Sequence, residues 1–332
     1  DKFNGSQWDL HSSYPPGKSA NYPPLIAYLA AIGFIIANLF AKVPLAYVCF
    51  WMGAFIASLA VMPAYFLVKK ITNIYGGIVA GLLVGLAPAY IGHTHAGFFD
   101  TDMFGMVIPL LIVLFFILSL SADNFRKRTV YASLAAFSML LFALAWQGWW
   151  YIYYLIIASM VIYLLVTHYI FPLKPKKSTD VLKGRLAWFN NKPDFFTFAV
   201  FMVLSIILMS IFLGVIGFLW ALTEPIHVDQ IQATVQTTSY PNVYLTVGEL
   251  RPTDMDDVVG GVGGLLPFLF GFLGMVALCW NLKPKKEKKE IVEEKTRKPR
   301  RRGRSNHRKE ENKEYKADKV IIKSDVGYEK SN

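Results

Sequence analysis

The chain has 332 residues, of which 54% are hydrophobic and only 17% are charged, whereas a soluble domain usually carries about 25% charged residues. This composition, with a mean hydropathy of +0.38 and two cysteines, argues against a soluble enzyme, a disordered protein and a disulfide scaffold. The net charge of +11 belongs mainly to residues 283–332, which hold 19 basic and 10 acidic side chains.

Eight apolar segments follow one another along the chain. Most of them are close to the ~20 residues that a helix needs to cross a ~30 Å hydrocarbon core. They lie at 24–41, 44–68, 74–92, 103–121, 129–147, 149–171, 195–222 and 260–281. The sequence therefore predicts an all-α polytopic membrane protein with long outer loops.

Basic loops predict the orientation of these segments, because cytoplasmic loops are enriched in Lys and Arg. Lys69-Lys70, Arg126–Arg128, the basic region 173–194 and the tail after Leu282 are expected in the cytoplasm. The turn at 100–102 and the long loop 223–259 then face outside. Segment 24–41 breaks this alternation, and its Tyr-Pro-Pro entry favours a helix lying in the outer membrane interface.

The first candidate site is the stretch HTHAGFFDTDMFGM at 93–106. Carboxylates at the edge of a membrane span are costly and are usually functional. On one turn, Asp100 and Asp102 offer two hard oxygen ligands to a divalent cation such as Mg²⁺ or Mn²⁺. The alternative is structural, with Asp102 as the N-cap of the following helix.

Two histidines precede these aspartates. His93 and His95 stand two residues apart, a spacing that also occurs in zinc sites, but His11 and His227 are isolated in the sequence. A contact of one histidine with a phosphate, or a histidine that only lies at the interface, is the preferred interpretation.

The second candidate lies in the outer loop, in YPNVYLTVGELRPTD. The predicted topology places Glu249 on the same side of the membrane as Asp100 and Asp102. Three carboxylates from two distant loops can form a cation site, although a glutamate such as Glu249, taken alone, is more often a solvated loop residue.

These motifs together resemble the catalytic subunit of oligosaccharyltransferase. The chain is most similar to the single-subunit archaeal and bacterial enzymes, the dolichyl-phosphooligosaccharide–protein glycotransferases. The resemblance rests on GFFDTDM in the first outer loop, TVGE in a later outer loop, and the opening SSYPPGKSANYPPLIAYLAA, and it covers roughly residues 8–282.

The resemblance implies a metal-dependent glycosyltransferase of the GT-C type, multi-pass in the cell membrane, with its active site on the outer face. Such an enzyme transfers an oligosaccharide from a dolichyl phosphate or diphosphate lipid to asparagine in Asn-x-Ser/Thr. It implies that Asp100, Asp102 and Glu249 hold Mn²⁺ or Mg²⁺, that Glu249 also binds the acceptor asparagine, and that His93 lies near the donor phosphate. Membrane lipid is expected as a partner, and nucleic acid is not.

Three parts follow from this interpretation: an outer loop with an interfacial helix (1–43), a transmembrane catalytic domain with a flexible outer loop at 223–259 (44–282), and a basic cytoplasmic tail or loop without stable structure (283–332). The family's first-span acidic motif, its later spans and its Trp-Trp-Asp-type motif are not found in these residues. The chain is therefore expected to be the N-terminal membrane portion of a longer enzyme.

Two alternatives remain open. One is another GT-C transferase that uses a polyprenyl-phosphate sugar. The other is a non-catalytic transporter or assembly subunit, although transporter sites usually lie near the bilayer midplane.

Overall fold

The computed structural model describes residues 8–9, 18–19, 23–166, 181–182, 184–223 and 254–281. The chain divides into two compact units, residues 1–272 and 273–332. Of the second unit, the structure describes residues 273–281, which belong to the last helix. Near the N-terminus, β1 (Trp8–Asp9) and β2 (Lys18–Ser19) form a short antiparallel pair in which Trp8 lies opposite Ser19.

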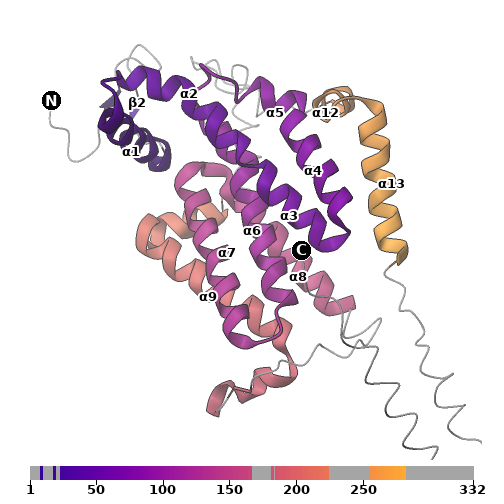
Figure 1. The fold of residues 1–332 in the computed structure, drawn as a ribbon. Coiled ribbons are helices and arrows are strands. Elements are labelled where there is room, and N and C mark those ends of the chain that lie inside the picture. Colours follow the sequence, from indigo (N-terminus) through magenta and orange to yellow (C-terminus); the bar gives the residue numbers. More distant parts are fainter. Residues whose placement is uncertain are drawn as a thin grey trace, which may run out of the picture. The chain divides into compact units, whose positions relative to one another are not determined.

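The other regular elements of the described chain are helices (Figure 1). The elements are α1 (Pro24–Phe40), α2 (Leu45–Ser58), α3 (Val61–Ile71), α4 (Ile74–Leu86), α5 (Pro88–Gly92), η1 (Thr101–Met103), α6 (Phe104–Ser121), α7 (Phe125–Ala145), η2 (Gln147–Trp149), α8 (Trp150–Leu165), η4 (Gly184–Asn191), α9 (Pro193–Leu213), a helix over 215–223, α12 (Met255–Gly261) and α13 (Leu265–Asn281).

Six helical stretches in the described residues are long and apolar enough to span a membrane, and the bent pair α12–α13 gives a seventh if it counts as one span. This result confirms the all-α polytopic fold. Helix α1 has 17 residues and is a shorter apolar helix. Its place in the outer interface stays a prediction.

Prolines divide two of the predicted helices. Pro63 has no N–H and so cannot bond the carbonyl of Leu59, and the segment 44–68 is interrupted there, between α2 and α3. Ala87 precedes Pro88 and adopts an extended conformation (ψ 118°), as a residue before proline tends to do. The short helix α5 begins directly after this residue.

Helix α7 lies at the centre of the bundle and packs against both α6 and α9 (Figure 1). Its inner face is lined by small residues, and Ala132, Ala135 and Ala136 are fully buried. Small side chains let membrane helices approach closely. By contrast, large apolar side chains of α4 such as Leu82 and Leu86 are exposed, as suits a surface that meets lipid.

A polar cluster joins three helices at the end where α7 begins. Arg128 is fully buried, and its Nη1 atom lies 3.1 Å from Oδ1 of Asp194 in α9. Nη1 also donates to the carbonyl of Pro193 and to the hydroxyl of Thr197. The hydroxyl of Tyr163 in α8 donates to Oδ2 of Asp194 at 3.0 Å. The contacts of the guanidinium all involve Nη1, while Nε and Nη2 are buried without a hydrogen-bond partner, so the pairing with Asp194 offsets only part of the cost of burying this charge.

Candidate functional site: an aspartate turn anchored on helix α2

The loop from His93 to Asp100 connects α5 to η1 and is attached closely to α2. The backbone N–H of Gly97 donates to the carbonyl of Phe50 at 2.8 Å. A Cβ atom on Gly53 would collide with the carbonyl oxygen of Phe98. Gly97 has a φ of +94°, a conformation that favours glycine. Glycines on both sides thus allow the loop backbone to lie directly on α2.

Tyr90 ties the same loop to its two neighbouring elements. Its hydroxyl donates to the carbonyl of Ala57 at the end of α2 and to the carbonyl of Met103 in η1, at 3.2 and 3.3 Å. The hydroxyl of buried Thr94 donates in turn to the carbonyl of Tyr90. The turn that carries the aspartates is therefore held from both sides.

The two aspartates have different local roles. Asp100 is the N-cap of η1, and its Oδ1 accepts from the backbone N–H of Thr101 at 2.6 Å. Asp102 lies in the first turn, and the N-cap of α6 is Met103, which makes no side-chain cap. The structural alternative thus applies to Asp100 and is wrong for Asp102.

Asp102 is half-buried and lies on the same turn as Asp100. Its Oδ2 atom lies 3.6 Å from Nδ1 of His93. The structure therefore brings together three of the four predicted site residues. Glu249, the fourth, lies outside the described residues, as do residues 224–253 of the predicted flexible loop.

The two histidines share a ring contact with Phe98 but have different polar partners. His93 is largely exposed and its ring packs edge-on against Phe98. His95 places Nδ1 3.1 Å from the carbonyl of Gly92 and packs its ring against the same Phe98. His95 thus helps to shape the loop, while His93 lies beside the carboxylates.

This donor set fits a hard divalent cation. Two carboxylates lie on one anchored turn, and among the described residues the basic side chain within 4 Å of Asp102 is His93. Mg²⁺ and Mn²⁺ prefer such oxygen ligands. No group of three or more His, Cys, Asp or Glu side chains suited to a metal occurs in the part of the chain that the structure describes, so a complete site needs a further ligand.

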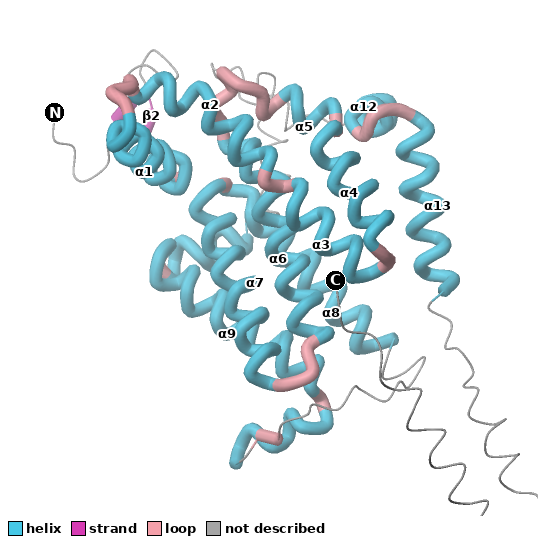
Figure 2. The backbone as a smooth tube through the Cα atoms, in the orientation of Figure 1, coloured by secondary structure: helices cyan, strands magenta, loops and turns pink. Residues whose placement is uncertain are grey.

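Helix α12 brings the end of the 223–259 region to this part of the protein. It packs on α5, the helix that leads into the aspartate loop, with Gly261 against Ala89 and Gly263 against Pro88. Figure 2 shows α12 and the loop after α5 at the same end of the helices. Glu249 precedes Asp254, where the description resumes, by five residues, which span at most roughly 17 Å.

Tyr90, Gly53 and Phe50 also shape the site, and the sequence did not predict their roles. Tyr90 stands just before the HTHAGFFDTDM motif, but no sequence pattern around a tyrosine in an apolar run predicts that its hydroxyl makes a hydrogen bond. Gly53 is one of many glycines in apolar segments, and only the approach of Phe98 distinguishes it.

Fold and site together define a polytopic helical membrane protein with paired carboxylates on a fixed loop at one end of its spans. Residues 2–284 match the family model described as oligosaccharyl transferase STT3, N-terminal. The chain therefore belongs to this family. Membership confirms the resemblance drawn from the motifs and, with it, the GT-C-type fold.

Individual relatives agree with the family. A dolichyl-phosphooligosaccharide-protein glycotransferase of Methanococcus voltae is 26% identical over 280 residues, covering 81% of this chain and 30% of the relative. An undecaprenyl-diphosphooligosaccharide–protein glycotransferase of Campylobacter jejuni is 26% identical over 69% of this chain and 34% of its own length. The chain thus spans about a third of the curated relatives it matches.

Among solved structures, the chain is similar to an archaeal oligosaccharyltransferase from Archaeoglobus fulgidus in complex with an inhibitory peptide and a dolichol-phosphate. The TM-score is 0.49 at 17% identity, and the match covers 82% of this chain and 31% of the other.

Proposed function

We propose that the protein to which these residues belong transfers an oligosaccharide from a dolichyl phosphate or diphosphate lipid to asparagine in Asn-x-Ser/Thr. The STT3 family match over residues 2–284 carries this proposal, and the names of the relatives in Methanococcus and Campylobacter support it. The active site is proposed to lie on the outer face of the cell membrane, opposite the basic loops.

Asp100, Asp102 and Glu249 are proposed to hold Mn²⁺ or Mg²⁺. A cation held by these residues would supply Lewis-acid neutralisation of the charge that develops on the leaving phosphate. The anchored turn supports this role, because Tyr90 and the Gly97–Phe50 hydrogen bond fix the backbone that carries both aspartates. Carboxylates held in place need no reorganisation when charge develops on the donor.

His93 is proposed to contact the donor phosphate. It lies beside Asp102 and is 64% exposed in its side chain, so a ligand can reach it. A protonated imidazole at this position adds one positive charge next to a phosphate, and a neutral one donates a single hydrogen bond.

Glu249 is proposed to bind the acceptor asparagine as well. A carboxylate accepts hydrogen bonds from the amide N–H groups, and such bonds can turn the amide nitrogen out of conjugation with its carbonyl. The packing of α12 on α5 supports a position near the aspartates, since Glu249 is linked to α12 by a short piece of chain.

A transfer assay tests the function. The complete gene is expressed, and membranes are given lipid-linked oligosaccharide, an Asn-x-Thr peptide and Mn²⁺. We expect glycopeptide from the wild type and a loss of at least about 100-fold in Asp100→Ala, Asp102→Ala and Glu249→Ala. Asp256→Ala, an exposed acid on α12, is the matched control and should retain activity. A folded wild type that transfers no glycan refutes the function.

A further inference from the structure

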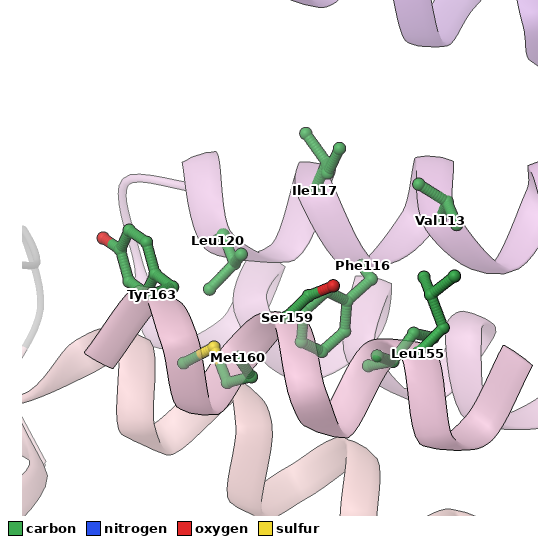
Figure 3. Close-up of a pocket in the computed structure, with 9 residues that line it drawn as sticks. Val113, Phe116, Ile117, Leu120, Leu155, Ser159, Met160 and Tyr163 are labelled. Carbon is green, nitrogen blue, oxygen red and sulfur yellow. The ribbon is translucent and has the colours of Figure 1, made fainter. Parts of the chain in front are cut away.

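A shallow groove of about 260 Å³ runs between α6 and α8 (Figure 3). Buried Phe116, Ile156 and Met160 form its floor. The ring of Phe116 rests against Phe201 of α9 at 5.3 Å, so the floor is closed from behind. Exposed Leu155 forms part of the rim. The groove is thus a packed depression in the bundle.

The groove lies at membrane depth and its chemistry is that of a hydrocarbon site. Both walls belong to candidate membrane spans, and Ser159 and Tyr163 supply the hydroxyl groups among otherwise apolar lining residues. It extends from Val113 to Leu120 along α6, which is roughly 10 Å at the helical rise. A spanning helix needs contacts along ~30 Å, whereas one segment of a lipid chain fits this length.

One end of the groove is polar. Figure 3 shows Tyr163 at the same end as Leu120, with its hydroxyl at the end of the row of lining side chains. That hydroxyl donates to Asp194, which pairs with Arg128 in the first turn of α7. These contacts place the start of α7 next to the polar end of the groove, where Tyr163 lies.

The start of α7 also carries basic side chains that are exposed. Arg126 and Lys127 precede Arg128 and are both exposed. The segments 122–128 and 190–194 together hold four basic and two acidic residues. One of the acidic residues, Asp194, forms a salt bridge with Arg128. Basic side chains at a membrane surface attract anionic headgroups.

We propose that this groove binds one chain of an anionic phospholipid from the leaflet that meets the basic loops. The phosphate of the lipid lies toward Arg126 and Lys127, and the hydrocarbon chain passes Tyr163 and Ser159 toward Val113. The site is separate from the aspartate turn, which precedes the opposite end of α6. The proposal does not depend on the transfer reaction.

Native mass spectrometry of the full-length protein tests the site. The protein is equilibrated with equal amounts of phosphatidylglycerol and phosphatidylcholine before analysis. We expect one tightly retained phosphatidylglycerol in the wild type. Ser159→Trp, which fills the groove, should reduce its occupancy at least fivefold, and Ser159→Leu is a milder substitution if the first variant fails to fold. Ile207→Trp, on the exposed surface of α9, should retain the lipid.

A charge-matched pair tests the headgroup. Arg126→Gln with Lys127→Gln should abolish the preference for phosphatidylglycerol, whereas Lys69→Gln with Lys70→Gln, a basic pair at the end of α3, should keep it. Equal occupancy in Ser159→Leu and Ile207→Trp would overturn the proposal. So would retention of a polyprenyl lipid in place of phospholipid, or a folded wild type that retains no lipid.

Discussion

The hydroxyl of Tyr90 donates a hydrogen bond to the carbonyl of Met103, the residue that follows Asp102, at 3.3 Å. The same hydroxyl donates to Ala57. Tyr90→Phe removes both contacts without changing the ring. We expect the loss of these hydrogen bonds to cost about 1 kcal/mol. Because Asp102 becomes less fixed, the affinity for Mn²⁺ should be approximately fivefold weaker. Titration with Mn²⁺ followed by electron paramagnetic resonance measures this affinity.

Tyr75→Phe is the control for this substitution, because Tyr75 is 76% exposed on α4. Equal Mn²⁺ affinity in Tyr90→Phe and Tyr75→Phe would show that the Tyr90 hydroxyl does not position the turn.

Gly53→Ala tests the close approach of the aspartate loop to α2. The added methyl group collides with the carbonyl of Phe98, which is backbone and has little room to move. We expect a loss of about 1–3 kcal/mol in stability, measured as a lower midpoint of thermal unfolding. Gly271→Ala, where a Cβ meets no atom within 4 Å, should not be destabilised. An unchanged midpoint in Gly53→Ala would contradict the described contact.

The buried ion pair of Arg128 and Asp194 predicts a larger effect. Asp194→Asn leaves the buried guanidinium without its counter-charge, and we expect a loss of about 3 kcal/mol or more. The double variant Arg128→Met with Asp194→Leu should recover much of this loss, because it removes both charges at once. Thermal unfolding of both variants, beside the exposed control Asp256→Asn, measures the difference. A double variant less stable than Asp194→Asn would refute this explanation.

His93 is predicted to act on the donor more than on stability. Its contact with Asp102 is exposed, so His93→Ala should change the free energy of unfolding by less than about 0.5 kcal/mol. The KM for lipid-linked oligosaccharide should rise several-fold, and His93→Arg should restore it by keeping a positive charge. Initial rates at varied donor and saturating peptide give this KM. A KM that is the same in all three proteins would remove His93 from the donor site.

The helical segments were largely predictable, because an apolar run of about 20 residues has few other solutions. The prolines at the breaks, Pro63 and Pro88, are visible in the sequence, but both lie inside long apolar segments that were each predicted as one helix. For the site, the sequence predicted Asp100, Asp102 and His93 as neighbours, since they share one short loop. It did not predict Tyr90, whose role depends on two carbonyls that come from other elements.

Arg128 shows where local patterns mislead. The run Arg126–Arg128 indicates a basic loop on the cytoplasmic side, which stays a prediction. Within the run, Arg126 and Lys127 are exposed, whereas Arg128 is fully buried. Asn124 caps α7 by accepting from the N–H of Lys127, so the helix begins before the basic run and directs Arg128 inward. Its partner, Asp194, is 66 residues away.

The turn bearing Asp100 and Asp102 and the segment bearing Glu249 are proposed to form one cation site. Mn²⁺ titration of the full-length protein by electron paramagnetic resonance tests this directly, in the wild type, Asp102→Ala, Glu249→Ala and the control Asp256→Ala. We predict at least about tenfold weaker binding in both Asp102→Ala and Glu249→Ala and wild-type binding in the control. Wild-type Mn²⁺ affinity in Glu249→Ala would contradict the claim.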